Sequence, residues 1–196
     1  MLCAMPPTLQ TDRLLLTPVQ DDDLPALHAH WNDPRVGRFL LYGAPVPAST
    51  VAYLIARSHH TFQTQGWGLW IIRPGPDPPA GTAPIGVCGL APFDHGPGVE
   101  LLYSLAPTHW SQGLATEAAT AVLAYAFTTL GLPEILATTD DANHPSLHVL
   151  ARLGAVPTTR VQVGPHTYPC FTIHPPKDPG MLPSGPCSSM DRATDF

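Results

Sequence analysis

Lysine is almost absent from this chain of 196 residues: Lys177 is the single one, among 9 basic and 15 acidic residues. The formal net charge is −6. So few cations cannot build a dense basic face, which argues against a nucleic-acid scaffold and against polyanionic partners. Charged residues make up 12% of the chain and hydrophobic residues 44%, which is typical of a folded globular protein rather than a disordered one.

The chain also lacks paired cysteines and clustered metal ligands. Cys88 lies in an apolar run and is predicted to be a small core residue. His28 and His30 would diverge on a helix, and neither they nor the pair His59-His60 belong to a Glu-x-x-His pattern, so we expect no metal. No cysteine forms a Cys-x-x-Cys pair, and the spread fits neither a zinc motif nor a disulfide framework; the four are Cys3, Cys88, Cys170 and Cys187.

A third absence is that of long apolar runs. No run approaches the length that spans a bilayer, and the N-terminus has no basic region followed by an apolar core. We therefore expect no signal peptide, no membrane segment and a reducing, cytoplasmic location.

Proline, in contrast, is abundant, and its 25 residues cluster in loops and at the ends of the chain. The length suits one domain with a sizeable core. We expect a loose leader at residues 1–10, one domain at residues 11–174, and a dispensable, disordered tail at residues 175–196, where Pro, Gly, Ser and charge dominate.

Hydrophobic patterning predicts strands and helices in a mixed order. Strands are predicted at residues 14–17, 67–72, 83–90, 99–105, 134–138, 155–163 and 167–173, the last two joined around Gly164-Pro165. Helices are predicted at residues 24–31, at residues 50–63 with Ser49 as N-cap, at residues 114–130 and at residues 146–153. This order fits an α/β (α+β) fold with a single mixed, mostly antiparallel central sheet flanked by helices.

The stretch at residues 107–118 joins a predicted strand to a long apolar helix. Gly113 and the small Ala115 lie between them, where a bulky side chain would block close approach to the backbone. The first amides of a helix have no internal partners, and the helix dipole favours an anion there. The stretch therefore predicts a phosphate-binding turn, although the same residues taken alone indicate only a tight connection.

A second strand-to-helix junction follows, at residues 134–153. The predicted strand leads to a turn that contains Asn143 and Ser146, and a short helix starts there. Both residue types are preferred as helix caps, and a capping residue can also face a ligand.

Together these segments resemble the GCN5-related N-acetyltransferase (GNAT) superfamily, in its RimJ/RimL-like branch of ribosomal-protein-alanine acetyltransferase type. The resemblance covers residues 11–173. The segments that carry it are Thr11-Asp12-Arg13-Leu14-Leu15-Leu16, Asn32-Asp33-Pro34, Trp110-Ser111-Gln112-Gly113-Leu114-Ala115-Thr116-Glu117-Ala118, Asn143-His144-Pro145-Ser146 and Val149-Leu150-Ala151-Arg152-Leu153-Gly154. The branch often has Gly where this chain has Ser111, a mild departure that bears on the turn.

The resemblance implies the GNAT fold and acetyl-coenzyme A as co-substrate. It places the pyrophosphate of the coenzyme on the loop around Gly113, and the pantetheine arm beside the strand that ends at Leu105 and beside Asn143. The coenzyme-binding residues that it implies are Ser104, Leu105, Gln112, Gly113, Leu114, Ala115, Thr116, Asn143 and Ser146.

Attack of an amine on a thioester needs an acceptor for the amine proton and a donor for the leaving thiolate. Glu100 begins the strand that flanks the coenzyme and is our candidate base; the alternative is a solvated strand residue. Ser146 is the candidate donor, and Tyr103 is a weaker candidate, since a tyrosine there is more often a packed core aromatic.

We therefore expect an acetyl-coenzyme A-dependent N-acetyltransferase that acts on a primary amine by direct attack in a ternary complex. The acceptor is a small-molecule amine or a protein N-terminal α-amine, and the predicted helices at residues 24–31 and 50–63 form much of its wall. The alternative is a non-catalytic module that binds acyl-coenzyme A as a sensor. Nothing in the sequence decides between a monomer and a homodimer.

Overall fold

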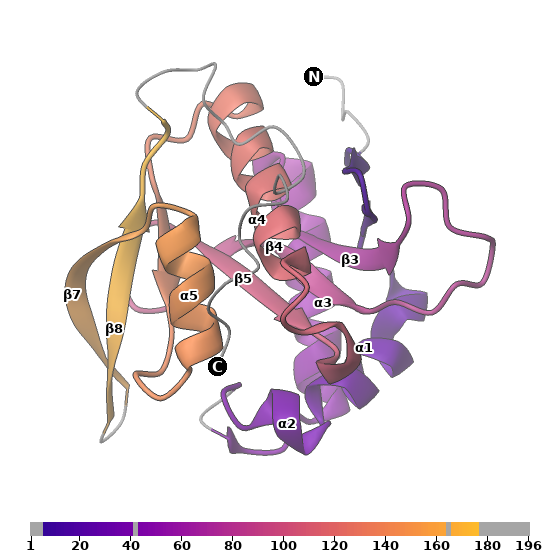
Figure 1. Cartoon of the computed structure of the whole chain (residues 1–196), viewed down its shortest axis with the longest axis horizontal. Coiled ribbons are helices and arrows are strands. Elements are labelled where there is room, and N and C mark those ends of the chain that lie inside the picture. The colour runs from indigo at the N-terminus through magenta and orange to yellow at the C-terminus, as the bar shows by residue number, and fades with distance from the viewer. Residues whose placement is uncertain (1–5, 41–42, 164–165, 177–196) are drawn as a thin grey trace.

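One eight-stranded sheet organises the protein, in the strand order β1-β2-β3-β4-β5-β6-β8-β7 (Figure 1). The computed structural model describes residues 6–40, 43–163 and 166–176. Cys3, Cys187, Lys177, the Gly164-Pro165 turn and the tail from residue 177 onward lie outside the described residues, so the expectations about them stay predictions.

The first five strands form an antiparallel meander. Its elements are β1 (Leu9–Gln10), β2 (Leu14–Pro18), the 3₁₀ turn η1 (Asp21–Asp23), α1 (Leu24–Trp31), α2 (Pro34–Gly37), α3 (Ala48–Gln65), β3 (Leu69–Pro74), β4 (Gly86–Pro92) and β5 (Val99–Leu105). Hydrogen-bonded registers join β2 to β3, β3 to β4 and β4 to β5 along most of their lengths. The strand β5 therefore has a rigid neighbour on one of its edges.

The second half contributes the remaining elements and the one parallel pair among the described strands, β5 with β6. These elements are the 3₁₀ turn η3 (Pro107–His109), α4 (Leu114–Ala124), its π-helical continuation η4 (Tyr125–Thr129), β6 (Ile135–Thr138), α5 (His144–Arg152), β7 (Val156–Val163) and β8 (His166–Ile173). The expected mixed, mostly antiparallel sheet is confirmed.

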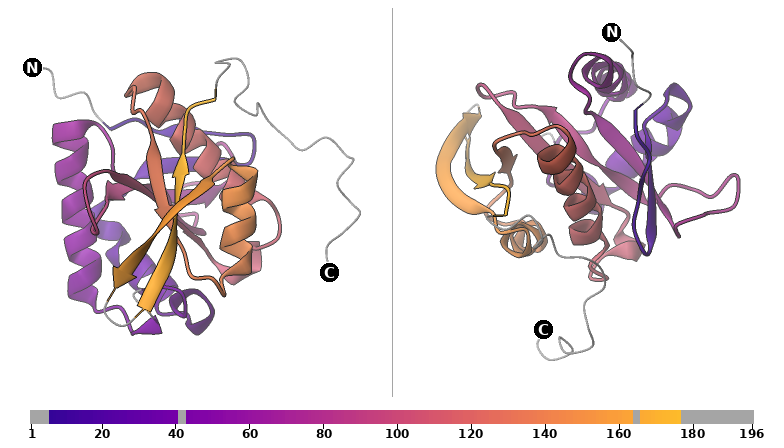
Figure 2. Two further views of the ribbon diagram at one scale, coloured as in Figure 1. Left: turned by 90° about the vertical axis from the view of Figure 1, so that its left-hand side faces the viewer. Right: turned by 90° about the horizontal axis from the view of Figure 1, so that it is seen from above.

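Helices cover both faces of the sheet, and each face has its own apolar cluster (Figure 2). One cluster packs α4 and α5 against the sheet, with Leu114 and Leu150 among its buried residues. The other packs α1 and α3 against the opposite face, around Trp31 and Ile55. Residues of β5 alternate between the two, since Leu101 belongs to the first cluster and Leu102 packs against the second.

Several element boundaries differ from the sequence-based ones. Leu9–Gln10, expected to belong to a loose leader, pairs with Leu15 and Leu16 as β1. Ser49 is not the N-cap of α3: Pro47 takes that position, and its carbonyl accepts from the amides of Thr50 and Val51. The helix α5 starts at His144 rather than at Ser146, because Asn143 caps it.

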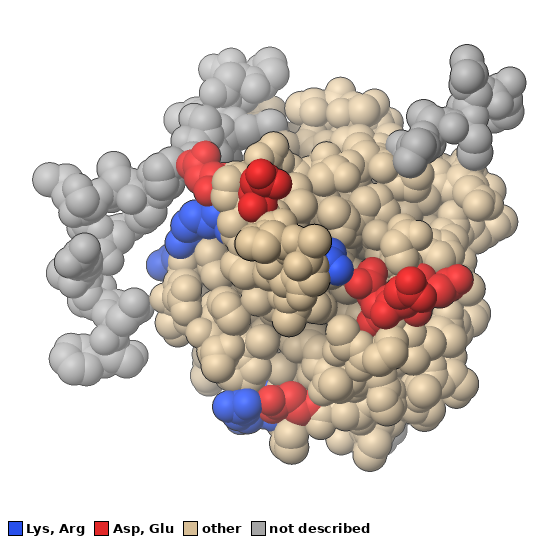
Figure 3. Space-filling model, turned by 90° about the vertical axis from the view of Figure 1, so that its right-hand side faces the viewer, with Lys and Arg blue, Asp and Glu red and all other residues tan. Residues whose placement is uncertain are grey.

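Charge is sparse on the surface. Figure 3 shows the acidic and basic side chains of one face in a few small groups, with most of that face uncharged. No helix of the described residues combines the length and the apolar character that a membrane crossing requires.

Candidate functional site

The sheet opens between β5 and β6. These parallel strands are paired at one position, Glu100 with Leu136. Beyond that pair, β5 continues to Leu105 and β6 to Thr138 with no further register between them. The strands therefore diverge toward their carboxyl ends, where ligands of open α/β sheets commonly bind. We call this opening the β5–β6 split.

One border of the split is the loop that leads from β5 into α4. Ser111 and Gly113 both have left-handed backbones, with φ of 56° and 74°. Trp110 ties the loop to the strand, since its Nε1 donates to the carbonyl of Leu105 at 2.6 Å. The first α-helical bond runs from the amide of Glu117 to the carbonyl of Gly113, so the three amides between them precede the helical ladder. Ser111 thus has a backbone conformation that a Gly at this position would adopt more easily.

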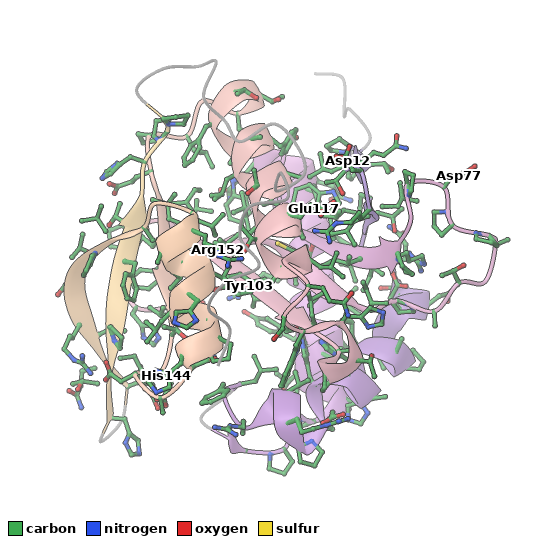
Figure 4. The ribbon with its side chains drawn as sticks, viewed as in Figure 1. Asp12, Asp77, Tyr103, Glu117, His144 and Arg152 are labelled. Atoms are coloured by element: carbon green, nitrogen blue, oxygen red, sulfur yellow. The ribbon has the colours of Figure 1, made fainter. Side chains whose placement is uncertain are left out.

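The turn between β1 and β2 contacts this loop and the first turn of α4 through side-chain hydrogen bonds. The Arg13 Nε donates to Glu117 Oε2 at 2.7 Å, and the Arg13 NH1 donates to the carbonyl of Gln112 at 2.9 Å. The other Glu117 oxygen accepts from the Thr11 hydroxyl at 2.6 Å. Figure 4 shows Glu117 on α4, on the side where the turn between β1 and β2 carries Asp12. The motifs containing Thr11, Arg13 and Glu117 suggested the family, but no local pattern indicated that they are in contact.

The other border of the split is the start of α5. Asn143 is its N-cap, and its side-chain oxygen accepts from the amide of Ser146 at 3.3 Å. The hydroxyls of Tyr103 and Ser146 lie 2.8 Å apart, and the Tyr103 hydroxyl lies 3.2 Å from the Ser146 carbonyl. Burial raises the pKa of Tyr103 to about 12, so its hydroxyl keeps its proton at neutral pH. Two of the predicted proton-transfer residues therefore meet in one hydrogen-bonded pair across the split.

Glu100 lies apart from this pair, at the closed end of the split. Its Oε1 accepts from the backbone amide of Thr138 at 3.1 Å and from the Thr138 hydroxyl. Burial raises the pKa of Glu100, and the two hydrogen bonds from Thr138 oppose that rise. The side chain is half-buried and engaged, which differs from the alternative of a solvated strand residue. Strand alternation puts Glu100 on the face opposite to Tyr103, so the structure does not bring these two candidates together.

Ser104, two positions beyond Leu102, is the third residue of β5 on that face. Its hydroxyl accepts from the Trp31 Nε1 at 3.0 Å, and the His30 Nε2 lies 3.0 Å from the same oxygen. Burial lowers the pKa of His30, which favours the neutral ring. These bonds fix the end of α1 on β5, a link that patterning within either element did not indicate.

Metal ligation has no support in the described part of the chain, where no group of three or more His, Cys, Asp and Glu side chains gathers. The two described cysteines, Cys88 and Cys170, are free and buried. Cys88 lies in the core, as expected, and burial raises the pKa of its thiol.

Similarity to known proteins settles the family. Residues 13–156 match the acetyltransferase (GNAT) domain family. The chain belongs to the GNAT acetyltransferases. An uncharacterized N-acetyltransferase of Bacillus licheniformis, p20, is 30% identical over 148 residues, which cover 74% of this chain and 80% of that protein. As a member of this family, the chain is an acetyl-coenzyme A-dependent acetyltransferase.

Solved structures show the same fold. The acetyltransferase from Agrobacterium tumefaciens superposes with a TM-score of 0.74 at 27% identity, covering 86% of this chain and 95% of that one. RimJ from Mycobacterium smegmatis, solved in complex with CoA-disulfide, superposes with a TM-score of 0.65 at 18% identity, covering 87% of this chain and 88% of that one. At 18% identity, the second of these shows the shared fold.

The residues present fit the coenzyme that this family uses. The loop before α4 has two left-handed residues, Ser111 and Gly113, and helical amides that precede the first helical bond, a combination suited to a pyrophosphate. Beyond Glu100 the edge of β5 has no pairing register with β6, so its main chain is not paired with that strand there. The Asn143 turn supplies polar groups on the other side.

Proposed function

We propose that this protein transfers the acetyl group of acetyl-coenzyme A to a primary amine by direct attack within a ternary complex, with the β5–β6 split as the reaction site. The observation that supports this proposal most directly is the split itself. The parallel strands β5 and β6 are paired only at Glu100 with Leu136, and the N-termini of α4 and α5 border the opening. Bound acetyl-coenzyme A would supply an activated thioester whose carbonyl carbon an amine attacks, with release of the thiol.

The loop before α4 would bind the pyrophosphate through backbone amides at Gln112, Gly113, Leu114, Ala115 and Thr116. The loop has left-handed backbone at positions 111 and 113, a conformation that occurs in anion-binding loops. The backbone of Ser104 and Leu105 would pair with the pantetheine arm as an added strand. Asn143 would hydrogen-bond the same arm from α5.

The two faces of β5 would divide the proton transfers. Glu100 lies on the face covered farther along the strand by α1, and its second carboxylate oxygen is our candidate acceptor for the amine proton. Ser146, on the other face, is our candidate donor to the leaving thiolate. When the Tyr103 hydroxyl donates to the Ser146 oxygen, the Ser146 proton can move to the sulfur while the Tyr103 proton replaces it, and the tyrosine then regains a proton from water.

The acceptor would meet the coenzyme on the α1 and α3 side of the sheet. It is a small-molecule amine or a protein N-terminal α-amine. The resemblance to ribosomal-protein-alanine acetyltransferases favours the protein N-terminus, whereas the net charge of −6 mildly suits a cationic small molecule.

A thiol-release assay with a panel of primary amines and N-terminal peptides tests this function. We expect turnover with at least one acceptor and a loss of about 100-fold in Glu100→Gln, the lower end of what general-base removal costs. Glu134→Gln, a change at an exposed residue just before β6, is the matched control and should keep full activity. Inert wild-type protein that still binds acetyl-coenzyme A would support the sensor alternative.

A further inference from the structure

Four groups from distant parts of the sequence form one ion-pair cluster behind the α4 loop: Thr11, Arg13, Gln112 and Glu117. The guanidinium of Arg13 is bound on two sides, since its Nε and NH2 face Glu117 Oε2 at 2.7 and 2.5 Å, and its NH1 donates to the carbonyl of Gln112 at 2.9 Å. Glu117 Oε1 accepts from the Arg13 amide at 3.0 Å and from the Thr11 hydroxyl. The Glu117 side chain is 19% exposed, so both of its oxygens are held in a fixed place.

The bond to Gln112 sets the direction of an amide in the loop. A trans peptide places the carbonyl of one residue and the N–H of the next on opposite sides. Because the Gln112 carbonyl points to Arg13, the Gly113 N–H points away from the N-terminal strands. The strand order places β1 and β2 on one side of β5 and the β5–β6 split on the other.

Arg13 also controls charge at this helix start. Glu117 lies in the first turn of α4, close to the amides that would receive an anion. A bare carboxylate there would repel a pyrophosphate bound at those amides, and more strongly in partly buried surroundings than in water. The paired guanidinium cancels that charge, and its planar fork reaches the carboxylate and the carbonyl at once, which a lysine ammonium cannot do.

We propose that the Arg13–Glu117 pair is a positioning device for the pyrophosphate of the coenzyme. It orients the Gly113 amide through Gln112 and neutralises the carboxylate beside the anion site, without itself taking part in the chemistry. This inference rests on the proposed function, because it assumes that the α4 loop receives a pyrophosphate.

Calorimetric titration of coenzyme A into the wild type and three variants tests it. Arg13→Ala should weaken binding about 10-fold or more, since a charge-assisted contact of this kind is worth at least ~1.4 kcal/mol. Arg13→Lys should lose less than Arg13→Ala, because the ammonium keeps the charge that neutralises Glu117 but lacks the planar fork that also bonds the Gln112 carbonyl. The double variant Arg13→Ala/Glu117→Gln should bind more tightly than Arg13→Ala, since the repelling carboxylate is gone.

The double variant separates positioning from simple structural support. If the pair only stabilised the fold, removing both partners would bind coenzyme A no better than removing Arg13 alone. The matched control is Arg35→Ala, which breaks an exposed ion pair with Asp33 on α2 and should leave affinity unchanged. Thermal unfolding of each variant identifies any that fail to fold.

Two results would overturn the inference: coenzyme A affinity in Arg13→Ala within twofold of the wild type, or a double variant that binds no better than the single one. Failure of the proposed function would look different. If the α4 loop is not a coenzyme site, the wild type itself shows no binding of coenzyme A; if only the transfer step is absent, the affinities follow the expected order and the thiol-release assay shows no turnover.

Discussion

The two helices that border the β5–β6 split begin in different ways. The start of α5 is made locally, because Asn143 caps it three residues before Ser146. The start of α4 has no side-chain cap; its loop has left-handed backbone at Ser111 and Gly113 and is held by Arg13, about a hundred residues earlier in the chain. One border is therefore encoded in a short segment, and the other depends on the assembled sheet.

That difference has a functional side. The α5 border presents side-chain hydroxyls, Ser146 with Tyr103, which suit proton transfer. The α4 border presents backbone amides, which suit a pyrophosphate. We therefore expect substitutions at the α5 border to lower the rate, and substitutions behind the α4 border to lower coenzyme affinity.

The largest effect is expected at the hydroxyl pair. Ser146→Ala should lower kcat about 100-fold and Tyr103→Phe about 10-fold, because the first removes the proton donor and the second only its hydrogen-bond partner. Steady-state kinetics with the acceptor found in the amine panel would measure both. Ser49→Ala, at an exposed position of α3, is the control. A rise in KM for acetyl-coenzyme A with unchanged kcat would assign both hydroxyls to binding instead.

The cap of α5 comes next. Asn143→Ala should lower the free energy of unfolding by about 1 kcal/mol, because the amide of Ser146 loses its side-chain acceptor. Urea denaturation would measure the change. Unaltered stability would mean that the start of α5 does not depend on its local cap, and the contrast between the two borders would fail.

In the loop before α4, a substitution at Ser111 should increase stability, in contrast to Asn143→Ala. Ser111→Gly should raise the free energy of unfolding by about 0.5 kcal/mol, since relief of the left-handed strain exceeds the added flexibility of the unfolded chain. The same denaturation experiment applies. A loss of stability would show that Ser111 makes contacts that outweigh its backbone strain.

The smallest effect is expected at Glu100, at the closed end of the split, as a shift in the pH dependence of activity. Below its pKa, Glu100 is protonated and cannot accept the amine proton, so activity should rise with pH as it ionises. Burial already places that pKa above its usual range, and Thr138 pulls it down. Thr138→Val removes the hydroxyl bond and should move the acidic limb of kcat/KM to higher pH. An unmoved limb would mean that another group sets it.

The sequence predicted locally encoded features well, and it did not predict contacts between distant segments. Local signals were enough for the bounds of β5, the glycine turn at Gly113 and the polar turn at Asn143. Contacts between distant segments were not predictable from patterning, as Arg13 with Glu117 and Tyr103 with Ser146 show. These side chains meet only after the sheet has brought their elements together.

Boundary errors also have physical causes. Ser49 is a good cap residue by type, yet the chain turns into α3 two residues earlier, with the Pro47 carbonyl accepting the first bonds. The predicted helix at residues 114–130 is continuous in its apolar pattern, but its last turns are π-helical from Tyr125 onward, where the Tyr125 hydroxyl donates to the carbonyl of Gly66. The first outcome is local, since Pro47 lies within the same segment, whereas the Tyr125 contact joins residues that are far apart in the sequence.

The most direct test of the account is a titration of coenzyme A into isotope-labelled protein, followed by amide NMR. The account predicts saturable shifts concentrated at residues 104–105, 112–116 and 143–146, the two borders and the edge of the β5–β6 split. Absence of shifts, or shifts centred away from these three segments, would contradict it.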